Sequence, residues 1–455
     1  MQRIDQQQGG MNREEFRAAL SLSSVYALRM LGLFMILPVF ALYATDLEGV
    51  TPSLTGLAIG IYGLTQAVLQ IPAGLLSDRI GRKPVIVGGL LVFALGSVVA
   101  ALADSMLVVI LGRALQGAGA IAAAIMALAA DLTREQHRIK AMALIGMSIG
   151  LSFALALVLG PVLNDWVGVP GIFAITAVLA LGGILVVLLV VPHPVVSRPH
   201  RVAEAIPAQF GRVLRHTQLL RLDFGILMLH AILTASFVVL PLILRDQAGV
   251  DAGAHWMIYL PVLVFSILAM LPLIIMAERK GRTRPVFLFA IVLLISAELG
   301  LFILPVTLFS VVLMMFVFFT AFNLLEAMLP SLISRIAAAD CRGTAMGFYS
   351  SSQFFGAFLG GALGGVLHQY AGTHAVFLCS AMGATVWLLL ALSMARPERL
   401  SSFIYKIDGG EAEAAEQLAQ RLRGMAGVSE AVVVAEEGVA YLKVDKRVFD
   451  EASLP

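Results

Sequence analysis

The chain has 455 residues, of which 59% are hydrophobic and only 13% are charged, and its mean hydropathy is +0.92. A soluble fold would have to expose a very large apolar surface to carry this composition, which therefore excludes a soluble globular protein. The net charge of +2 is too small to indicate a nucleic-acid partner. The two cysteines, Cys341 and Cys379, form no CxxC pair or Cys/His cluster, so we expect no disulfide, iron–sulfur cluster or metal site.

Long apolar segments follow one another along most of the chain. A helix needs about 20 mostly apolar residues to cross the hydrocarbon core of a bilayer. Residues 1–19 are polar and lack the features of a signal peptide, so we expect the first apolar segment to remain as an anchor. The sequence predicts twelve membrane-spanning helices, near residues 20–44, 54–76, 84–103, 105–130, 138–162, 168–192, 222–246, 254–276, 284–305, 307–332, 342–368 and 372–394.

The basic residues between these helices predict the orientation. Short loops rich in Arg and Lys stay in the cytoplasm. Loops on one side contain Arg82, Arg138 and the basic cluster 279–284, whereas the opposite loops are acidic, with Arg245 as their one basic residue. Both termini are therefore expected in the cytoplasm. The expected division is a polar N-terminus (1–19), a six-helix half (20–192), a cytoplasmic linker (193–221), a second six-helix half (222–394) and a C-terminal domain (395–455).

The composition changes after residue 394 to that of a small α+β domain. Residues 403–407 and 439–444 alternate like strands, 431–435 is a short β-prone run, and 411–425 has the pattern of an amphipathic helix. The order β-α-β-β resembles a ferredoxin-like fold. The link 408–410 contains no cysteine, so the thiolate site of similar metal-binding domains is missing. We expect an interaction or regulatory domain whose partner is a cytoplasmic ligand or protein.

Between the second and third predicted helices the chain reads GLLSDRIGRK, from Gly74 to Lys83, and residues 276–285 nearly repeat its basic part as MAERKGRTRP. A hairpin that occurs once in each half is typical of a two-halved secondary transporter. Gly81 permits a sharp turn, and Asp78 can accept charge-assisted hydrogen bonds. With the twelve predicted helices, this pattern resembles the major facilitator superfamily over residues 20–394. With the C-terminal domain, the chain resembles a subgroup of drug:proton antiporters over nearly its full length.

The resemblance implies a conformational latch at the cytoplasmic end of the helices. In the outward-facing state this latch would engage the N-terminus of the eleventh helix, whose dipole is positive there. The alternative is that the basic residues only fix the topology. In the second copy, Glu278, Arg279, Gly281 and Arg282 take equivalent places, without the Gly-x-Leu lead. The expected latch residues are Gly74, Asp78, Arg79, Gly81, Arg82, Asp131 and Gly343.

Two arginines lie inside apolar segments. Residues 112–117 match the superfamily's fourth-helix motif, in which the arginine, here Arg113, is associated with proton transfer. A charge in the membrane costs at least ~2.5–3.5 kcal/mol, so Arg113 and Arg29 should face the bundle and find partners. For Arg29, an interhelical hydrogen bond and a substrate contact are both open, as they are for the amides in these helices. The candidate cavity residues are Arg29, Gln66, Gln70, Gln116, Asn323 and Gln353.

Few titratable groups in the predicted helices can carry a proton. They include His230, Glu298 and Glu326, and burial can bring such groups into the range where protonation switches near neutral pH. The first, fourth, seventh and tenth helices line the cavity in the superfamily, which favours His230 and Glu326. Glu326 also follows Asn323 by three residues, on the same helical face. We expect Glu326, His230 and Arg113 to serve proton coupling, and Glu298 to be a packed carboxyl.

These patterns predict a proton-coupled secondary transporter of small organic molecules that works by alternating access, as a monomer in the inner membrane. The fifth helix has Gly160-Pro161 but lacks the paired glycines of the antiporter pattern, so efflux antiport is the first interpretation and symport the second. The competing class is a non-transporting sensor that signals through the C-terminal domain. The chain has no GxxxxGK[ST] loop and no catalytic constellation, so we expect neither ATP-driven transport nor an enzyme, and no cofactor.

Overall fold

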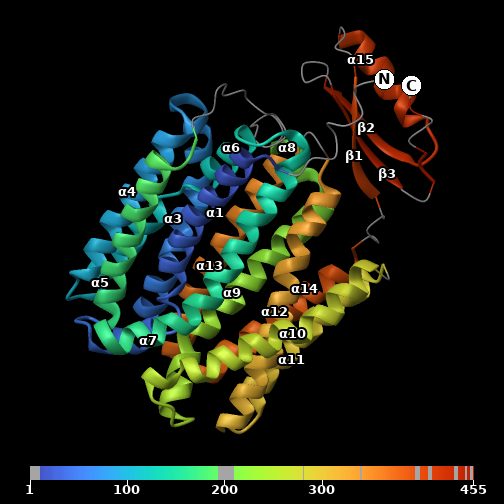
Figure 1. Cartoon of the computed structure of the whole chain (residues 1–455). Helices are drawn as coiled ribbons and strands as arrows, with labels where there is room; N and C mark the ends of the chain where they lie inside the picture. The colour runs from blue at the N-terminus through green and yellow to red at the C-terminus, as the bar shows by residue number, and fades with distance from the viewer. Residues whose placement is uncertain are drawn as a thin grey trace.

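The structure is a computed structural model, and it describes residues 11–192, 210–279, 281–338, 341–394, 400–407, 412–434, 439–445, 448–450 and 454. Figure 1 shows a body of long helices, with a small sheet and its helix at one end. The linker residues 193–209 and the link 408–410 lie outside the described residues.

The N-terminal half contains seven described helices and two interruptions that the sequence analysis did not place. The first predicted span breaks at residues 35–39, around Pro38, because proline cannot donate the hydrogen bond that continues a helix. The fourth breaks at Gly119. The fifth and sixth follow each other without a loop, separated by Gly168, whose φ is 67°. The helices are α1 (Arg13–Phe34), α2 (Phe40–Tyr43), α3 (Pro52–Ile80), α4 (Arg82–Ala101), α5 (Met106–Ala118), α6 (Ala122–Asp131) and α7 (Glu135–Leu189).

The second half begins with a short helix of the predicted linker and continues with six long helices. Two short 3₁₀ turns, η1 (Ala44–Asp46) and η3 (Ala252–Ala254), lie in loops. The helices are α8 (Phe210–Arg215), α9 (Thr217–Asp246), α10 (Trp256–Arg279), α11 (Thr283–Ile303), α12 (Leu308–Ile336), α13 (Arg342–Ala371) and α14 (Thr373–Leu392).

Nine helices within the described residues are long and apolar enough to cross a membrane. The long α7 counts once among them, although it covers two predicted spans. The helices α1 and α13 are not among the nine. The first begins with charged residues, and the second is rich in glycine and polar side chains. The fold is therefore a mostly helical, polytopic membrane fold, and the number twelve stays a prediction.

Helix α13 packs tightly between α9 of its own half and α3 of the other half. On one face, a methyl group at Gly360 would overlap the backbone of Ala231 in α9. On another, a methyl group at Gly361 would overlap the backbone of Gly56 and Gly60 in α3. Glycine lets helix backbones approach this closely. The contact with α3 involves the N-terminal part of α3 and the C-terminal part of α13, so it joins the two halves at one end of the bundle.

The C-terminal domain has the expected order β-α-β-β. Its elements are β1 (Leu400–Lys406), α15 (Ala412–Arg423), β2 (Val428–Val434) and β3 (Val439–Asp445). They form an antiparallel sheet in the order β1-β3-β2, in which Leu442 of β3 lies opposite Phe403 of β1 and Ala431 of β2. Leu422 of α15 packs with Ala431 and Leu442 in a small core. The element order is confirmed, whereas a ferredoxin-like fold remains a prediction.

Candidate functional site

The turn between α3 and α4 holds a buried cluster of charges. Arg82, the first residue of α4, donates hydrogen bonds to Asp78 in α3, to the Ser77 hydroxyl at 2.8 Å and to Asp131, the last residue of α6, at 3.4 Å. The side chains of Arg82 and Asp131 are 5% and 2% exposed. Arg82 lies at the N-terminus of α4, where the helix dipole is positive, and Asp131 lies at the C-terminus of α6, where it is negative. The dipole therefore destabilises each of these charges when it is unpaired. Pairing removes that penalty and ties α3, α4 and α6 together.

Two glycines shape this cluster. Gly81 has a φ of +97°, in the left-handed region that favours glycine. A side chain at Gly74 would press on Ala123 of α6, so this glycine lets α3 approach the helix that carries Asp131. Arg79 is exposed. Gly343 is the second residue of α13, and the described contacts of Asp78 do not include it. The structure therefore brings some of the expected latch residues into contact, but not all of them.

The corresponding turn in the second half is more exposed. Gly281 again has a positive φ, of 64°. Glu278 forms an ion pair with Arg335, the basic residue near the end of α12, at 3.5 Å. Their side chains are 61% and 39% exposed, so the pair contributes little. The two turns share a backbone shape, but a buried charge cluster like that of Arg82 is not among the described contacts of the second.

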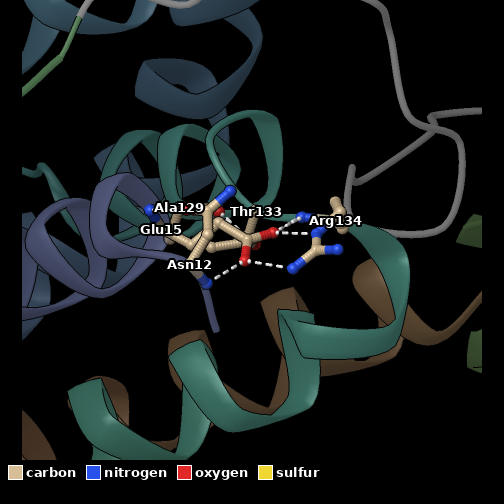
Figure 2. Close-up of polar contacts among 5 residues, drawn as sticks. All are labelled: Asn12, Glu15, Ala129, Thr133 and Arg134. Carbon is tan, nitrogen blue, oxygen red and sulfur yellow. Dashed lines mark hydrogen bonds and ion pairs between the residues drawn. The ribbon is translucent and has the colours of Figure 1, made fainter. Parts of the chain in front are cut away.

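A second ion pair, which the sequence analysis missed, lies beside the first cluster. Figure 2 shows Glu15 of α1 reaching the start of α7. Its carboxylate accepts hydrogen bonds from the backbone N–H of Arg134 at 2.8 Å and from Nε and Nη2 of Arg134 at 2.8 and 3.0 Å. It also closes a capping box with Asn12. The pattern Asn-x-x-Glu could have revealed the helix start, but not the partner 119 residues away.

These hydrogen bonds from Arg134 hold the pKa of Glu15 down to about 2, from an ordinary value of 4.5. Glu15 precedes the first predicted span. Because its pKa is depressed in the folded protein, its contribution to stability is present above the ordinary value and is lost as the pH falls toward about 2.

Glu15→Gln should therefore lower Tm by a few degrees at neutral pH. The difference from the unsubstituted protein should shrink as the pH falls through the window between 4.5 and about 2, as measured by thermal unfolding in detergent. Glu14→Gln is the matched control, because Glu14 is exposed and adjacent. A Tm difference that stays constant down to the acid end of this window would contradict the assignment of the pair as the cause.

Arg29 lies deep in the first half, and its side chain is held by α3. Its Nη2 donates to the Gln66 amide oxygen at 2.6 Å, and Gln66 in turn donates to Gln70 at 2.8 Å. The guanidinium lies 5.7 Å from the ring centroid of Tyr62 and 5.4 Å from that of Phe93. Three predicted cavity residues therefore form one chain of hydrogen bonds.

Arg113 of α5 lies on the same Tyr62 ring, 5.3 Å from its centroid. It donates to the Gln116 amide oxygen at 2.8 Å and to the backbone carbonyls of Ala58 and Ile59 at 3.3 and 3.4 Å. Tyr62 was not predicted as a site residue, and its contacts with both arginines join side chains from α1, α3 and α5. A cation over an aromatic ring is attracted by the ring's quadrupole.

The second half contains a polar cluster that joins three helices. Nδ1 of His230 in α9 lies 3.3 Å from the carbonyl oxygen of Ile226, so we assign the proton to Nδ1. Nε2 then accepts from the Gln353 amide of α13 at 2.9 Å. The same amide donates to Oε1 of Glu326 in α12 at 3.2 Å, and the other carboxyl oxygen lies 3.9 Å from His230 Nε2. At 3.9 Å these two atoms are too far apart for a direct hydrogen bond, so the Gln353 amide is the group that links the carboxyl to the imidazole.

Two other polar residues that the sequence singled out have partners outside this cluster. Asn323 donates to the Ser266 hydroxyl of α10 at 3.1 Å. Glu298 of α11 is fully buried and accepts a hydrogen bond from Ser236 of α9 at 3.1 Å. Within the part of the chain that the structure describes, no group of three or more His, Cys, Asp or Glu residues could hold a metal ion.

The comparisons with known proteins agree with this architecture. The family model of the Major Facilitator Superfamily matches residues 22–337 and 222–429, and that of the YajR YAM domain matches residues 409–453. The chain is 48% identical to the inner membrane transport protein YajR of Escherichia coli (strain K12), over 96% of each chain. It is 29% identical to the multidrug resistance protein MdtH of Aeromonas salmonicida (strain A449), over 82% of this chain and 93% of the relative.

A solved structure has the same fold. It is a bacterial homologue of the human lysosomal transporter Spinster, in an inward-facing and occupied conformation. The TM-score is 0.68 at 14% sequence identity, and the alignment covers 86% of this chain and 98% of that one.

Proposed function

The chain belongs to the Major Facilitator Superfamily, and we propose that it is a proton-coupled secondary transporter of small organic molecules that works by alternating access. Its family and its homologues are transporters, so it is not an enzyme. The observation that carries the proposal is the position of Glu326, a carboxyl inside a membrane helix that is linked through Gln353 to His230. Such intramembrane carboxyls are expensive to keep and typically serve ion or proton pathways.

Protonation of Glu326 would act on the two halves through α13. A neutral carboxyl interacts differently with the Gln353 amide and with His230 than a carboxylate does. Gln353 belongs to α13, which also packs against α3 of the other half at Gly361. A change in the polar cluster can therefore bias the contact between the halves, which is the element that must open and close.

We assign the structure to a state that is closed at the end where α3 begins and α13 ends. There the backbone N–H of Ser53 donates to the Gln369 side chain at 3.1 Å, across the two halves. With the orientation predicted from the basic loops, this end is periplasmic, so the state is inward-facing. We also propose that the chain crosses the inner membrane twelve times, with both termini in the cytoplasm, and that it works as a monomer. Its C-terminal domain is proposed to be a ferredoxin-like regulatory domain.

Efflux antiport is the proposed direction. It is supported by the similarity to proteins named multidrug resistance protein MdtH. Proton symport is the alternative, because the paired glycines of the antiporter pattern are missing from α7.

Reconstituted proteoliposomes with an imposed pH gradient test the proposal. A panel of small organic molecules is added, and a pH-sensitive dye reports proton movement. We expect at least one compound to dissipate the gradient faster than in protein-free liposomes. Saturable binding without any flux would instead support a membrane sensor, and the sign of the pH change distinguishes antiport from symport.

Asp78→Asn should shift the conformational population toward the inward-facing state. The substitution removes a charge that is worth about 0.3–2 kcal/mol near a helix end, so the proposed latch with the start of α13 weakens. Distances between spin labels at Ser53 and at Tyr370, an exposed residue next to Gln369, measure this population, and shorter distances should gain weight. Arg17→Gln is the control, because it changes an exposed charge near the start of α1 that is not part of the proposed latch. An unchanged distribution would leave Asp78 as a topology residue.

A further inference from the structure

The first half carries buried positive charge without an acid inside the membrane. Its six predicted spans contain no Asp or Glu. Arg29 and Arg113 are each 1% exposed. The hydrogen-bond acceptors described for them are neutral, namely the amides of Gln66 and Gln116 and two backbone carbonyls. A buried charge without a counter-charge is costly inside a membrane, so two such charges in one half call for a functional reason.

Two nitrogens of the Arg29 guanidinium have no hydrogen-bond partner among the described residues, whereas every nitrogen of Arg113 has one. Each of the three nitrogens of Arg113 donates to an acceptor. Among the described residues, Nε and Nη1 of Arg29 are buried and have no hydrogen-bond partner. The buried Tyr62 hydroxyl interacts with the Arg29 side chain, and no acceptor is described for its own O–H. Unused donors of a guanidinium and a phenol, next to one another and shielded from water, suit an anion that accepts several hydrogen bonds.

These donors lie at the junction of the two halves. The Tyr62 ring packs edge-on against Phe354 of α13, with 6.2 Å between centroids. Phe354 follows Gln353, the residue that holds Glu326 and His230. Arg29 in the first half and the polar cluster of the second half therefore border the same interface. The binding site of a two-halved transporter is expected at this interface.

We propose that Arg29, together with Tyr62, binds the anionic group of the transported molecule, a carboxylate, sulfonate or phosphate. This rests on the proposed function and adds the substrate class: organic anions, or zwitterions whose anionic end faces the first half. Nε and Nη1 of Arg29 donate charge-assisted hydrogen bonds to the anion, and the Tyr62 hydroxyl donates a further one. Arg113 adds a second positive charge near the same ring.

Thermal unfolding of the full chain in detergent tests this without any transport assay. The probes share one ring and differ in charge: benzoate, benzenesulfonate and phenyl phosphate, the neutral benzamide, and the cation benzyltrimethylammonium. We expect at least one anion to raise Tm by about 3 °C at saturation, and the neutral and cationic probes to leave it unchanged. Arg29→Gln should abolish the shift, whereas Arg29→Lys, which keeps the charge, should retain part of it.

Several outcomes would overturn the proposal: no anion stabilises the protein, the cation stabilises it instead, or Arg29→Gln leaves the anion shift intact. Phosphatidylglycerol is added as a separate probe, because a lipid headgroup has the same chemistry as a phosphate substrate. Stabilisation by this lipid alone, lost in Arg29→Gln, would identify the anion as a headgroup and overturn the assignment to substrate. Proton coupling is measured independently at Glu326, so failure here leaves the proposed function standing.

Discussion

Replacing Glu326 by glutamine is expected to reduce substrate-driven proton movement to the level of protein-free liposomes. Glutamine keeps the shape of the side chain and its contact with Gln353 but cannot carry a proton. Substrate binding, measured separately by thermal shift, should be largely retained. Without a known substrate, the coupling can be measured through the distance between spin labels at Ser53 and Tyr370. This distance should vary with pH in the unsubstituted protein and become independent of pH in the variant.

Glu298→Gln is the matched control for this experiment. Glu298 is another carboxyl in a membrane helix, but its described partner is the Ser236 hydroxyl, away from the cluster of Gln353 and His230. Its substitution should leave the pH dependence of the distance unchanged. If Glu326→Gln still couples flux to the pH gradient with normal pH dependence, the assignment is wrong and His230 becomes the leading proton carrier.

Gly361→Leu should open the contact between the two halves. Its new side chain would collide with the backbone of Gly56 and Gly60 in α3, and backbone cannot move aside as a flexible side chain can. Overpacking of this kind costs about 1–3 kcal/mol. It would change the ratio of closed to open molecules about 5- to 150-fold. We expect longer distances between labels at Ser53 and Tyr370, and slower transport because the closed state is disfavoured.

Two controls separate this effect from a general disturbance of helices. Gly182 in α7 has no neighbouring atom within 4 Å of an added Cβ, so Gly182→Leu should leave the distances unchanged. Gly360→Ala produces a clash with Ala231 inside the second half, so it should lower Tm without opening the contact between the halves. Equal distance changes in the three variants would refute a specific role for Gly361.

Local pattern was enough to predict several features of this protein. The apolar segments, the basic loops and the sequence around Asp78 and Arg82 depend on residues within a few turns of one another, so periodicity and spacing reveal them. The strand and helix order of the C-terminal domain was predictable for the same reason. The pairing of Arg82 with Asp131 came from the family resemblance, and the structure brings these two side chains together.

The tertiary structure alone determined which distant groups meet. Gln353 contacts His230 and Glu326, which lie 123 and 27 residues away, and Glu15 contacts Arg134 across 119 residues. Likewise, only helix packing brings both Arg29 and Arg113 close to the Tyr62 ring. In a membrane, hydropathy decides that a segment becomes a helix but not which face it turns to its neighbours, because lipid tails are as apolar as most side chains. Close glycine contacts and a few polar pairs decide that, and they depend on the assembled bundle.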